Sequence, residues 1–199
     1  MSHEFQDFMI WQQLGPNLPT RGNRFTAFVG RLLFRVMGWR IEGEFPNQSK
    51  LIVAVAPHTS NTDFFLAMAI VSGLGLHASY FAKQSLFKFP LRPLMVALGG
   101  IPVDRSSSQG LIGQMVEHFE NTEKLVLGIT PEGTRGKVGE WKRGFALIAQ
   151  AANVPILPAI LDVESKVVRF EKLITEVSDV DQVISTMQEL AKAGSPGNL

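Results

Sequence analysis

The sequence predicts an α/β fold in which one central sheet, mostly parallel or mixed, is flanked by helices. Two observations lead to this prediction. Apolar runs of strand length alternate with segments of helix length along most of the chain, and the run LIVAVA at residues 51–56 is continuously apolar. A continuous apolar run is typical of a strand buried on both faces of a sheet. Alternation of strands and helices favours a sheet that is covered by helices.

Length and composition favour a single globular domain. The chain has 199 residues, of which 45% are hydrophobic and 19% are charged, and this size supports a substantial core. We divide it into a Gly- and Pro-rich lead-in at residues 1–23 and a domain at residues 24–199. The net charge of +1 gives no overall field for nucleic acid, so we expect no such partner. The absence of cysteine excludes disulfides and thiolate chemistry.

The first predicted element is an N-terminal amphipathic helix at residues 24–38. Its apolar side chains recur at helical spacing, and arginines lie on another side. No acidic residue occurs between Asp7 and Glu42, whereas five arginines do. Two interpretations stay open: a helix packed on the core with a solvated basic face, or an interfacial helix whose arginines meet anionic lipid. The apolar stripe comprises Phe25, Phe28, Val29, Leu32, Leu33 and Val36.

The remaining elements follow in alternation. We predict strands at residues 51–56, 78–82, 101–103, 124–129, 155–161 and 166–170, and helices at 63–72, 91–98, 109–121, 144–152 and 179–193. No apolar run approaches the roughly 18 residues that span a bilayer. The N-terminus carries Glu4 and Asp7 and has no secretory signal pattern. We therefore expect a cytoplasmic protein whose membrane contact, if any, is peripheral.

Polar and Gly- or Pro-rich segments flank several predicted strand ends. In open α/β sheets, ligands bind beyond the carboxyl ends of the strands. The segments that match this description are PHTSNTDF after residue 56, GGIPVDR at 99–105, TPEGTR at 130–135 and NVPILP at 153–158. The sequence thus predicts a site at one edge of the sheet.

The first of these segments contains His58 and, five positions later, Asp63. Asp63 is placed to lie in the first turn of a helix, where the helix dipole favours a carboxylate. A tight turn can fold Asp63 back onto the His58 ring, fix its tautomer and make the other ring nitrogen a general base. Taken alone, the two residues also fit an ordinary capped helix start.

The chain offers no recognisable enzyme nucleophile. It has no Gly-x-Ser-x-Gly elbow and no cysteine, and Ser60 does not sit in such an elbow. The histidines are too scattered for a metal site, so we expect none. If His58 is a base, the group that it deprotonates therefore belongs to the substrate.

Two segments offer cations that suit phosphate. In TPEGTRGK, Gly133 allows a close backbone approach, and Arg135 provides a planar fork that Glu132 can orient. Arg105 follows Asp104 in GGIPVDR. Each segment alone also fits a solvated turn or a local salt bridge.

A third basic segment, YFAKQSLFKFPLRP at residues 80–93, interleaves Lys83, Lys88 and Arg92 with aromatic side chains. Binders of single-stranded nucleic acid share this pattern, but the net charge disfavours them. A basic surface that meets a phosphate-bearing lipid or cofactor fits better.

Four segments together resemble the glycerolipid (lysophosphatidate-type) acyltransferases. The His-x4-Asp block resembles residues 58–63, and the Gly-x-Ile-x-Val-Asp-Arg-like block resembles residues 100–105. Pro-Glu-Gly-Thr-Arg is matched at 131–135 and Val-Pro-Ile-x-Pro at 154–158. The resemblance covers roughly residues 50–160. One departure is Thr62, where related short bacterial members often carry tryptophan, and this difference concerns the shape of the acceptor pocket.

The resemblance implies an O-acyltransferase of the 1-acylglycerol-3-phosphate type, with His58 and Asp63 as the catalytic pair. It implies acyl-CoA or acyl carrier protein as the donor, a lysophospholipid or glycerol phosphate as the acceptor, and no further cofactor. Acceptor binding is implied for Arg105, Glu132, Gly133, Thr134 and Arg135, and Lys83 joins them as a nearby cation. The chain lacks the N-terminal membrane helices of some larger members, which implies a surface-bound enzyme. A catalytically silent lipid-binding protein and a thioester hydrolase on the same fold remain the alternatives.

Overall fold

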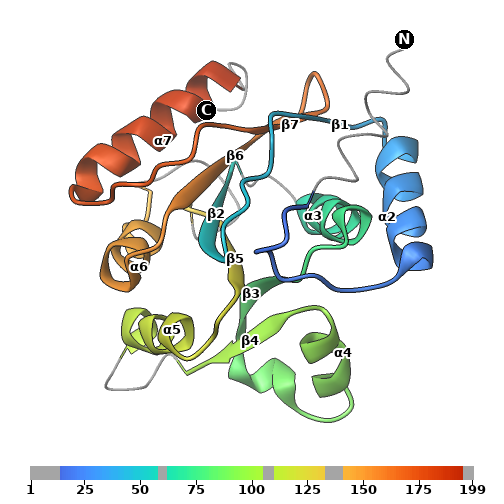
Figure 1. Cartoon of the computed structure of the whole chain (residues 1–199), viewed down its shortest axis with the longest axis horizontal. Coiled ribbons are helices and arrows are strands. Elements are labelled where there is room, and N and C mark those ends of the chain that lie inside the picture. Colours follow the sequence, from blue (N-terminus) through green and yellow to red (C-terminus); the bar gives the residue numbers. More distant parts are fainter. Residues whose placement is uncertain (1–13, 58–61, 105–109, 133–140, 195–199) are drawn as a thin grey trace.

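The computed structural model describes residues 14–57, 62–104, 110–132 and 141–194 (Figure 1). Its centre is a seven-stranded sheet with the order β1-β7-β6-β2-β5-β3-β4. Every neighbouring pair is parallel except β6 and β7, which are antiparallel. The predicted α/β class, with a mostly parallel sheet flanked by helices, is confirmed.

The strands agree closely with the predicted ones. They are β1 (Arg40–Glu42), β2 (Lys50–Ala56), β3 (Ala78–Lys83), β4 (Gly100–Val103), β5 (Leu125–Ile129), β6 (Ile156–Asp162) and β7 (Val167–Phe170). Only β1 lacks a counterpart in the prediction. It is three residues long with Ile41 alone buried, so it carries no apolar run, and its pairing with β7 is what places it in the sheet.

The helices form two layers, one on each side of the sheet (Figure 1). One side is covered by α5 (Gly110–Glu120), α6 (Gly144–Ala152) and α7 (Val180–Gly194), and we call it the α5–α7 face. The other carries α2 (Arg24–Val36) and α3 (Thr62–Leu74), and we call it the α2–α3 face. The β3–β4 connection, which contains the 3-10 helix η1 (Gln84–Phe87) and α4 (Arg92–Ala97), lies on the same side as α2 and α3.

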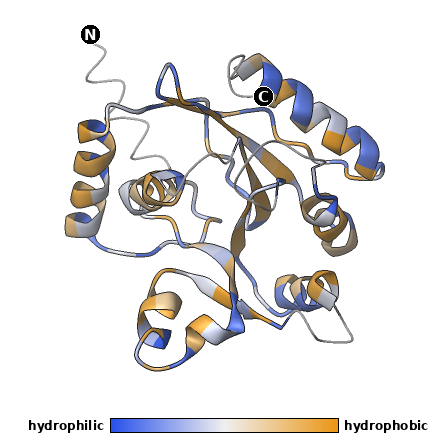
Figure 2. Cartoon of the chain, turned by 180° about the vertical axis from the view of Figure 1, so that it is seen from behind, coloured by the Kyte–Doolittle hydropathy of each residue, from blue (hydrophilic) through white to orange (hydrophobic). Residues whose placement is uncertain are grey.

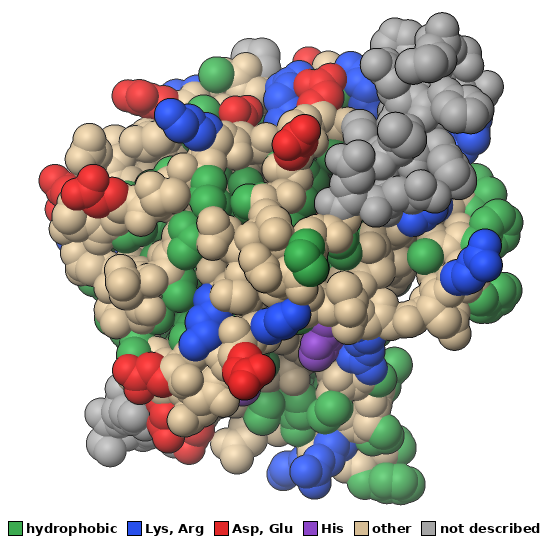
Figure 3. Space-filling view, viewed as in Figure 1, with side chains coloured by type: hydrophobic (Ala, Val, Ile, Leu, Met, Phe, Trp, Pro, Cys, Tyr) green, Lys and Arg blue, Asp and Glu red, His purple; other side chains and the backbone are tan. Residues whose placement is uncertain are grey.

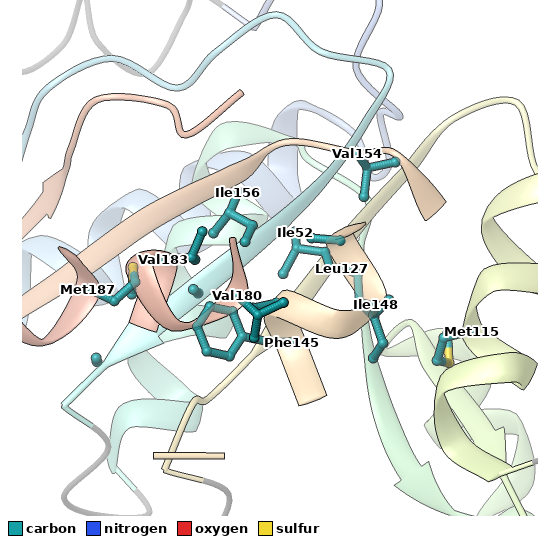
Figure 4. Packing of buried hydrophobic residues seen from close by; sticks show 14 of the residues in the cluster. Ile52, Met115, Leu127, Phe145, Ile148, Val154, Ile156, Val180, Val183 and Met187 are labelled. Carbon is teal, nitrogen blue, oxygen red and sulfur yellow. The ribbon is translucent and has the colours of Figure 1, made fainter. Parts of the chain in front are cut away.

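Strand β2 lies at the centre of the sheet, and both of its faces are buried. Successive side chains of a strand point to opposite faces of the sheet, so Ile52 and Ala54 lie on one face and Leu51 and Val53 on the other. The first pair belongs to the core of the α5–α7 face, and the second pair belongs to the core of the α2–α3 face. Figure 4 shows the first core, in which Ile52 and Leu127 of the sheet meet Phe145 of α6. The continuous apolar run at 51–56 is therefore explained by burial from both sides.

Helix α2 packs on α3 at very short range. Gly30 is buried, and a Cβ atom built on it would lie 2.5 Å from the Gly73 backbone nitrogen of α3. The Arg31 Nε atom donates to the Gly73 carbonyl over 2.9 Å. Arg31, one of the helix arginines that we expected to face solvent or lipid, is thus half-buried against α3.

The interpretation of the α2 stripe as core-packed is wrong. The buried residues of α2 are Gly30 and Phe34, whereas most of the predicted stripe faces outward. Periodicity identifies which side chains share a helix face, but not whether that face meets the core. The exposed fractions are 71% for Phe25, 61% for Phe28, 48% for Leu32, 53% for Leu33 and 75% for Val36. None of the helices in the described ranges is long and apolar enough to cross a bilayer.

Candidate active site at the carboxyl edge of the sheet

The strand registers bring the predicted site segments to one edge of the sheet. Ala54 of β2 lies opposite Ile129 of β5, and Gly128 of β5 lies opposite Tyr80 of β3. Lys83, at the end of β3, lies opposite Val103 of β4. Because these strands are parallel, their carboxyl ends meet at the same edge, in the order β2, β5, β3 and β4. His58, Glu132, Lys83 and Arg105 each follow or end one of these strands.

Asp63 lies in the first turn of α3, as the sequence predicts, and its side chain is half-buried. His58 lies outside the described residues, two positions after the last residue of β2. The buried central strand therefore ends just before His58, and α3 begins just before Asp63. Thr62, the residue that departs from the family pattern, begins α3 and is exposed.

Glu132 follows β5, the neighbour of β2, and is half-buried. The two ends of the loop that it begins are held together, because the Lys142 backbone N–H donates to the Pro131 carbonyl over 2.8 Å. Next to this closure, Trp141 is buried in the core of the α5–α7 face. Gly133, Thr134, Arg135 and Lys137, which the sequence places in the loop, lie outside the described residues.

The end of β4 is held by a residue that the sequence did not single out. The Gln114 amide of α5 accepts from the Asp104 N–H over 3.2 Å and donates to the Asp104 carbonyl over 2.8 Å. The same Nε2 atom lies 3.0 Å from the Gly110 carbonyl. Gln114 thus fixes the backbone immediately before Arg105, which itself lies outside the described residues. The spacing of residues in the sequence could not predict this contact, because it depends on how α5 packs beside the end of β4.

Lys83 is exposed at the carboxyl end of β3, where it precedes η1. On the same strand Tyr80, the only tyrosine of the chain, packs edge-to-face on Phe64 of α3 with ring centroids 5.8 Å apart. Burial raises the pKa of the Tyr80 hydroxyl above its ordinary value. This contact ties the turn of α3 that carries Asp63 to the sheet.

His77 is remote from this edge. It precedes β3 at the opposite, amino edge, where its backbone N–H donates to the Pro19 carbonyl over 2.8 Å. Burial and, to a smaller extent, Arg21 lower the pKa of the His77 imidazole below its ordinary value. A half-buried histidine with a lowered pKa at the amino edge is an ordinary structural residue and not part of the candidate site.

A mostly parallel sheet between two helical layers, with polar side chains gathered at its carboxyl edge, is the architecture of α/β proteins that bind ligands beyond their strand ends. Within that class, the chain belongs to the Acyltransferase family, whose model matches residues 39–162. The resemblance found in the four sequence blocks is thereby confirmed.

Named relatives agree with this assignment. The chain is 33% identical over 150 residues to a 1-acyl-sn-glycerol-3-phosphate acyltransferase of Cocos nucifera, a match that covers 71% of this chain and 47% of that protein. A protein of the same name from Limnanthes douglasii is 31% identical over 150 residues, with 70% and 51% covered. The chain therefore spans about half the length of these curated relatives.

Among solved structures, the fold is similar to the crystal structure of the 1-acyl-sn-glycerophosphate (LPA) acyltransferase PlsC from Thermotoga maritima. The TM-score is 0.64 at 20% sequence identity, and the match covers 86% of this chain and 77% of that one. At this identity the match supports the fold.

Proposed function

We propose that this chain transfers a fatty acyl group from a thioester, acyl-CoA or acyl carrier protein, to a hydroxyl of a lysophosphatidate-type acceptor. The acceptor class is supported by its relatives, which are named as 1-acyl-sn-glycerol-3-phosphate acyltransferases. The observation that carries the proposal is the junction of β2 and α3. The central strand ends two residues before His58, and Asp63 occupies the first turn of the helix that follows.

In this mechanism His58 acts as the general base. Its imidazole takes the proton of the acceptor hydroxyl while the hydroxyl oxygen attacks the thioester carbonyl carbon. The carbon–sulfur bond then breaks, an ester is formed, and the imidazolium returns the proton to the leaving sulfur as a free thiol. Asp63 orients the ring and stabilises its charged form. A positioned base of this kind contributes about 10²- to 10⁴-fold to the rate.

The strand order supports an acceptor that lies along the edge of the sheet. Adjacent strands are about 4.8 Å apart, so β5, β3 and β4 lie about 5, 10 and 14 Å from β2 across the sheet. Glu132, Gly133, Thr134 and Arg135 follow β5, next to the strand that leads to His58. We therefore assign Arg135 as the nearer phosphate ligand, and Lys83 and Arg105 as cations farther along the edge.

We further propose that the protein acts at the surface of an anionic membrane, from which it takes its acceptor. Helix α2 supports this, because it exposes Phe25, Phe28 and Val36 on one apolar side. The same helix carries arginines and lies in an acid-free part of the sequence. Such a helix binds lipid interfaces through its apolar face and its cations.

The test is a thioester assay that detects the free thiol. His58→Ala should lower kcat by about 10²- to 10⁴-fold, since it removes the base. Asp63→Asn should lower it less, because the base remains but loses its orienting charge. His77→Ala is the matched control, since His77 lies at the opposite edge. Near-wild-type turnover of His58→Ala would refute the mechanism.

The two arginines provide a second readout. Arg135→Ala should raise the acceptor KM more than Arg105→Ala does, because β5 is the closer strand. A lower kcat at unchanged KM would instead assign Arg135 to the transition state. Acceptors with and without phosphate, offered with acyl-CoA and with acyl carrier protein, identify both substrates. Thiol release that needs no acceptor would favour the thioester hydrolase, and lipid binding without thiol release would favour the silent lipid-binding protein.

A further inference from the structure

The β3–β4 connection exposes a second group of large apolar side chains. In the described part of the chain, fourteen large apolar side chains are exposed, and ten of them are concentrated in two places. Five lie on α2, and another five lie in η1, in α4 and between them. The second group, which we call the α4 ridge, comprises Leu86 (41% exposed), Phe89 (93%), Leu91 (49%), Leu94 (54%) and Val96 (54%).

The α4 ridge is surrounded by cations in a stretch without acids. Lys83, Lys88 and Arg92 lie within or beside it. No acidic residue occurs between Asp63 and Asp104. Since the net charge of the chain is only +1, this positive charge is local. Exposed apolar side chains flanked by Lys and Arg are complementary to an anionic bilayer, which accepts the apolar groups below its headgroups.

The α4 ridge and α2 lie on the same side of the molecule. Both are on the side of the sheet opposite α5, α6 and α7 (Figure 1). Figure 3 shows apolar side chains gathered over α2 and over the α4 region, with basic side chains near both, and Figure 2 shows the hydrophobic colouring of both helices from behind. Arg21, just before α2, donates from its Nη1 to the Val96 carbonyl at the end of α4 over 3.5 Å.

We propose that the α4 ridge is a second lipid-contacting element, which docks on an anionic bilayer together with α2. A protein partner fits less well, because Lys is depleted in protein–protein interfaces whereas two lysines flank this ridge. Long basic side chains at a membrane instead reach the headgroups while their stems lie on apolar surface. Contacts at both α2 and the α4 ridge fix the orientation of the protein on the bilayer, whereas a single amphipathic helix does not.

The orientation bears on the candidate active site. The β3–β4 connection begins at Lys83, on the carboxyl edge of the sheet, and returns to the amino edge at Gly100, where β4 starts. Docking through the first part of the ridge, at Leu86 and Phe89, therefore brings the bilayer surface beside the end of β3. The inference rests on the proposed membrane association, but it does not depend on the acyl-transfer chemistry.

The test measures the partition of the full chain onto sedimented vesicles of equal parts phosphatidylglycerol and phosphatidylcholine, and onto vesicles of phosphatidylcholine alone. Phe89→Ser combined with Leu94→Ser should weaken partition onto both vesicle types by about tenfold, because apolar burial is lost. Lys88→Glu combined with Arg92→Glu should weaken it by about tenfold on the anionic vesicles only. Leu111→Ser on α5 and Lys192→Glu on α7 are the matched controls, which we expect to leave partition unchanged.

The outcomes separate this inference from the proposed function. If the wild-type chain does not bind anionic vesicles, the membrane association and this inference both fail. If it binds and the ridge variants bind equally well, or change only the oligomeric state in gel filtration, the ridge assignment alone is overturned. If the ridge variants lose binding while His58→Ala retains turnover, the ridge stands and the acyl-transfer mechanism fails.

Discussion

The α5–α7 face buries most of the large apolar side chains of its helices, whereas α2 on the opposite face exposes most of its own. Met115, Phe145 and Met187 are 1%, 2% and 0% exposed. On α2, by contrast, Phe25 is 71% exposed and Val36 is 75% exposed. The same kind of apolar periodicity thus has two outcomes. On one face it holds the fold together, and on the other it leaves an apolar surface that we assign to lipid.

The comparison predicts that the largest difference in the free energy of unfolding lies between alanine substitutions of two phenylalanines, one on each face. Phe145→Ala, in the core of the α5–α7 face, should lower the free energy of unfolding by about 3–5 kcal/mol through lost burial and a residual cavity. Phe28→Ala on α2 should change it by no more than about 0.5 kcal/mol, because that side chain is already exposed. Urea unfolding followed by circular dichroism, without lipid, measures both. Similar losses for the two variants would contradict the division between the faces.

The second prediction concerns how α2 is held. In Gly30→Ala, the new Cβ would lie 2.5 Å from the Gly73 nitrogen and 2.8 Å from the Ala69 carbonyl oxygen. Both are backbone atoms, so the two helices must separate, and we expect a loss of about 1–3 kcal/mol from overpacking. Thermal unfolding measures it.

The matched control for this prediction is Gly144→Ala at the start of α6. Among the described residues, leaving out its chain neighbours and the backbone of α6, no atom lies within 4 Å of the Cβ that it would add. Its effect should be neutral or stabilising by up to about 1 kcal/mol, because alanine restricts the unfolded chain. If Gly30→Ala were as well tolerated as Gly144→Ala, the close contact of α2 with α3 would not support the fold.

A third prediction concerns an ion network that links strands β1, β6 and β7 to the end of α7. Arg169 of β7 donates to Glu42 over 2.9 Å and to the buried Asp162 over 3.3 Å, and its Nη1 lies 3.3 Å from the Gly194 carbonyl of α7. The Ser165 backbone N–H and then Arg169 lower the pKa of Asp162, and the Arg169 hydrogen bond lowers the pKa of Glu42.

Because both carboxyl pKa values are lowered in the folded state, the network stabilises the protein above the ordinary carboxyl pKa and loses this effect as the pH falls through the lowered values. Arg169→Met should therefore cost about 1–2 kcal/mol at neutral pH, and its difference from wild type should shrink on acidification. Unfolding at several pH values measures this. A difference that is constant with pH would rule out an electrostatic origin.

The sequence predicted a strand or helix wherever the apolar pattern that identifies it lies within that segment of the chain. The apolar run at 51–56 is sufficient to identify β2. Strand β1 was missed, because Arg40 and Glu42 are exposed and only its register with Val167–Arg169 of β7 makes it a strand. Local signal thus accounts for most of the sheet but not for an edge that depends on a distant partner.

The same distinction applies to the site. The spacing of Asp63 from His58 and the apolar strand before it predicted the position of Asp63 in the first turn of α3. The clamp of Gln114 on the Asp104 backbone was not predictable, because it needs the return of α5 to the end of β4. The outward orientation of α2 was not predictable either, since it follows from the burial of Gly30 against α3.

The smallest effect that we predict separates local from global stability on the α2–α3 face. The Asn23 side chain accepts from the Phe25 and Thr26 N–H groups, each over 3.0 Å, and the Thr26 hydroxyl accepts from the Asn23 N–H over 2.8 Å. Asn23→Ala should cost α2 about 1 kcal/mol, and Asn23→Gly only a few tenths. Hydrogen exchange should show the loss in the amides of α2.

The location of this loss is the informative part. Since α2 buries only Gly30 and Phe34, it can unfold locally while the core of the α5–α7 face stays intact. Exchange of the α6 amides should therefore be unchanged in Asn23→Ala. Anionic vesicles should restore protection of α2 in the variant, because lipid that binds the helical form stabilises it by mass action. If protection from exchange fell equally in α6, the two faces would unfold as one unit. The exposure of the apolar stripe of α2 would then not be linked to local unfolding of this helix.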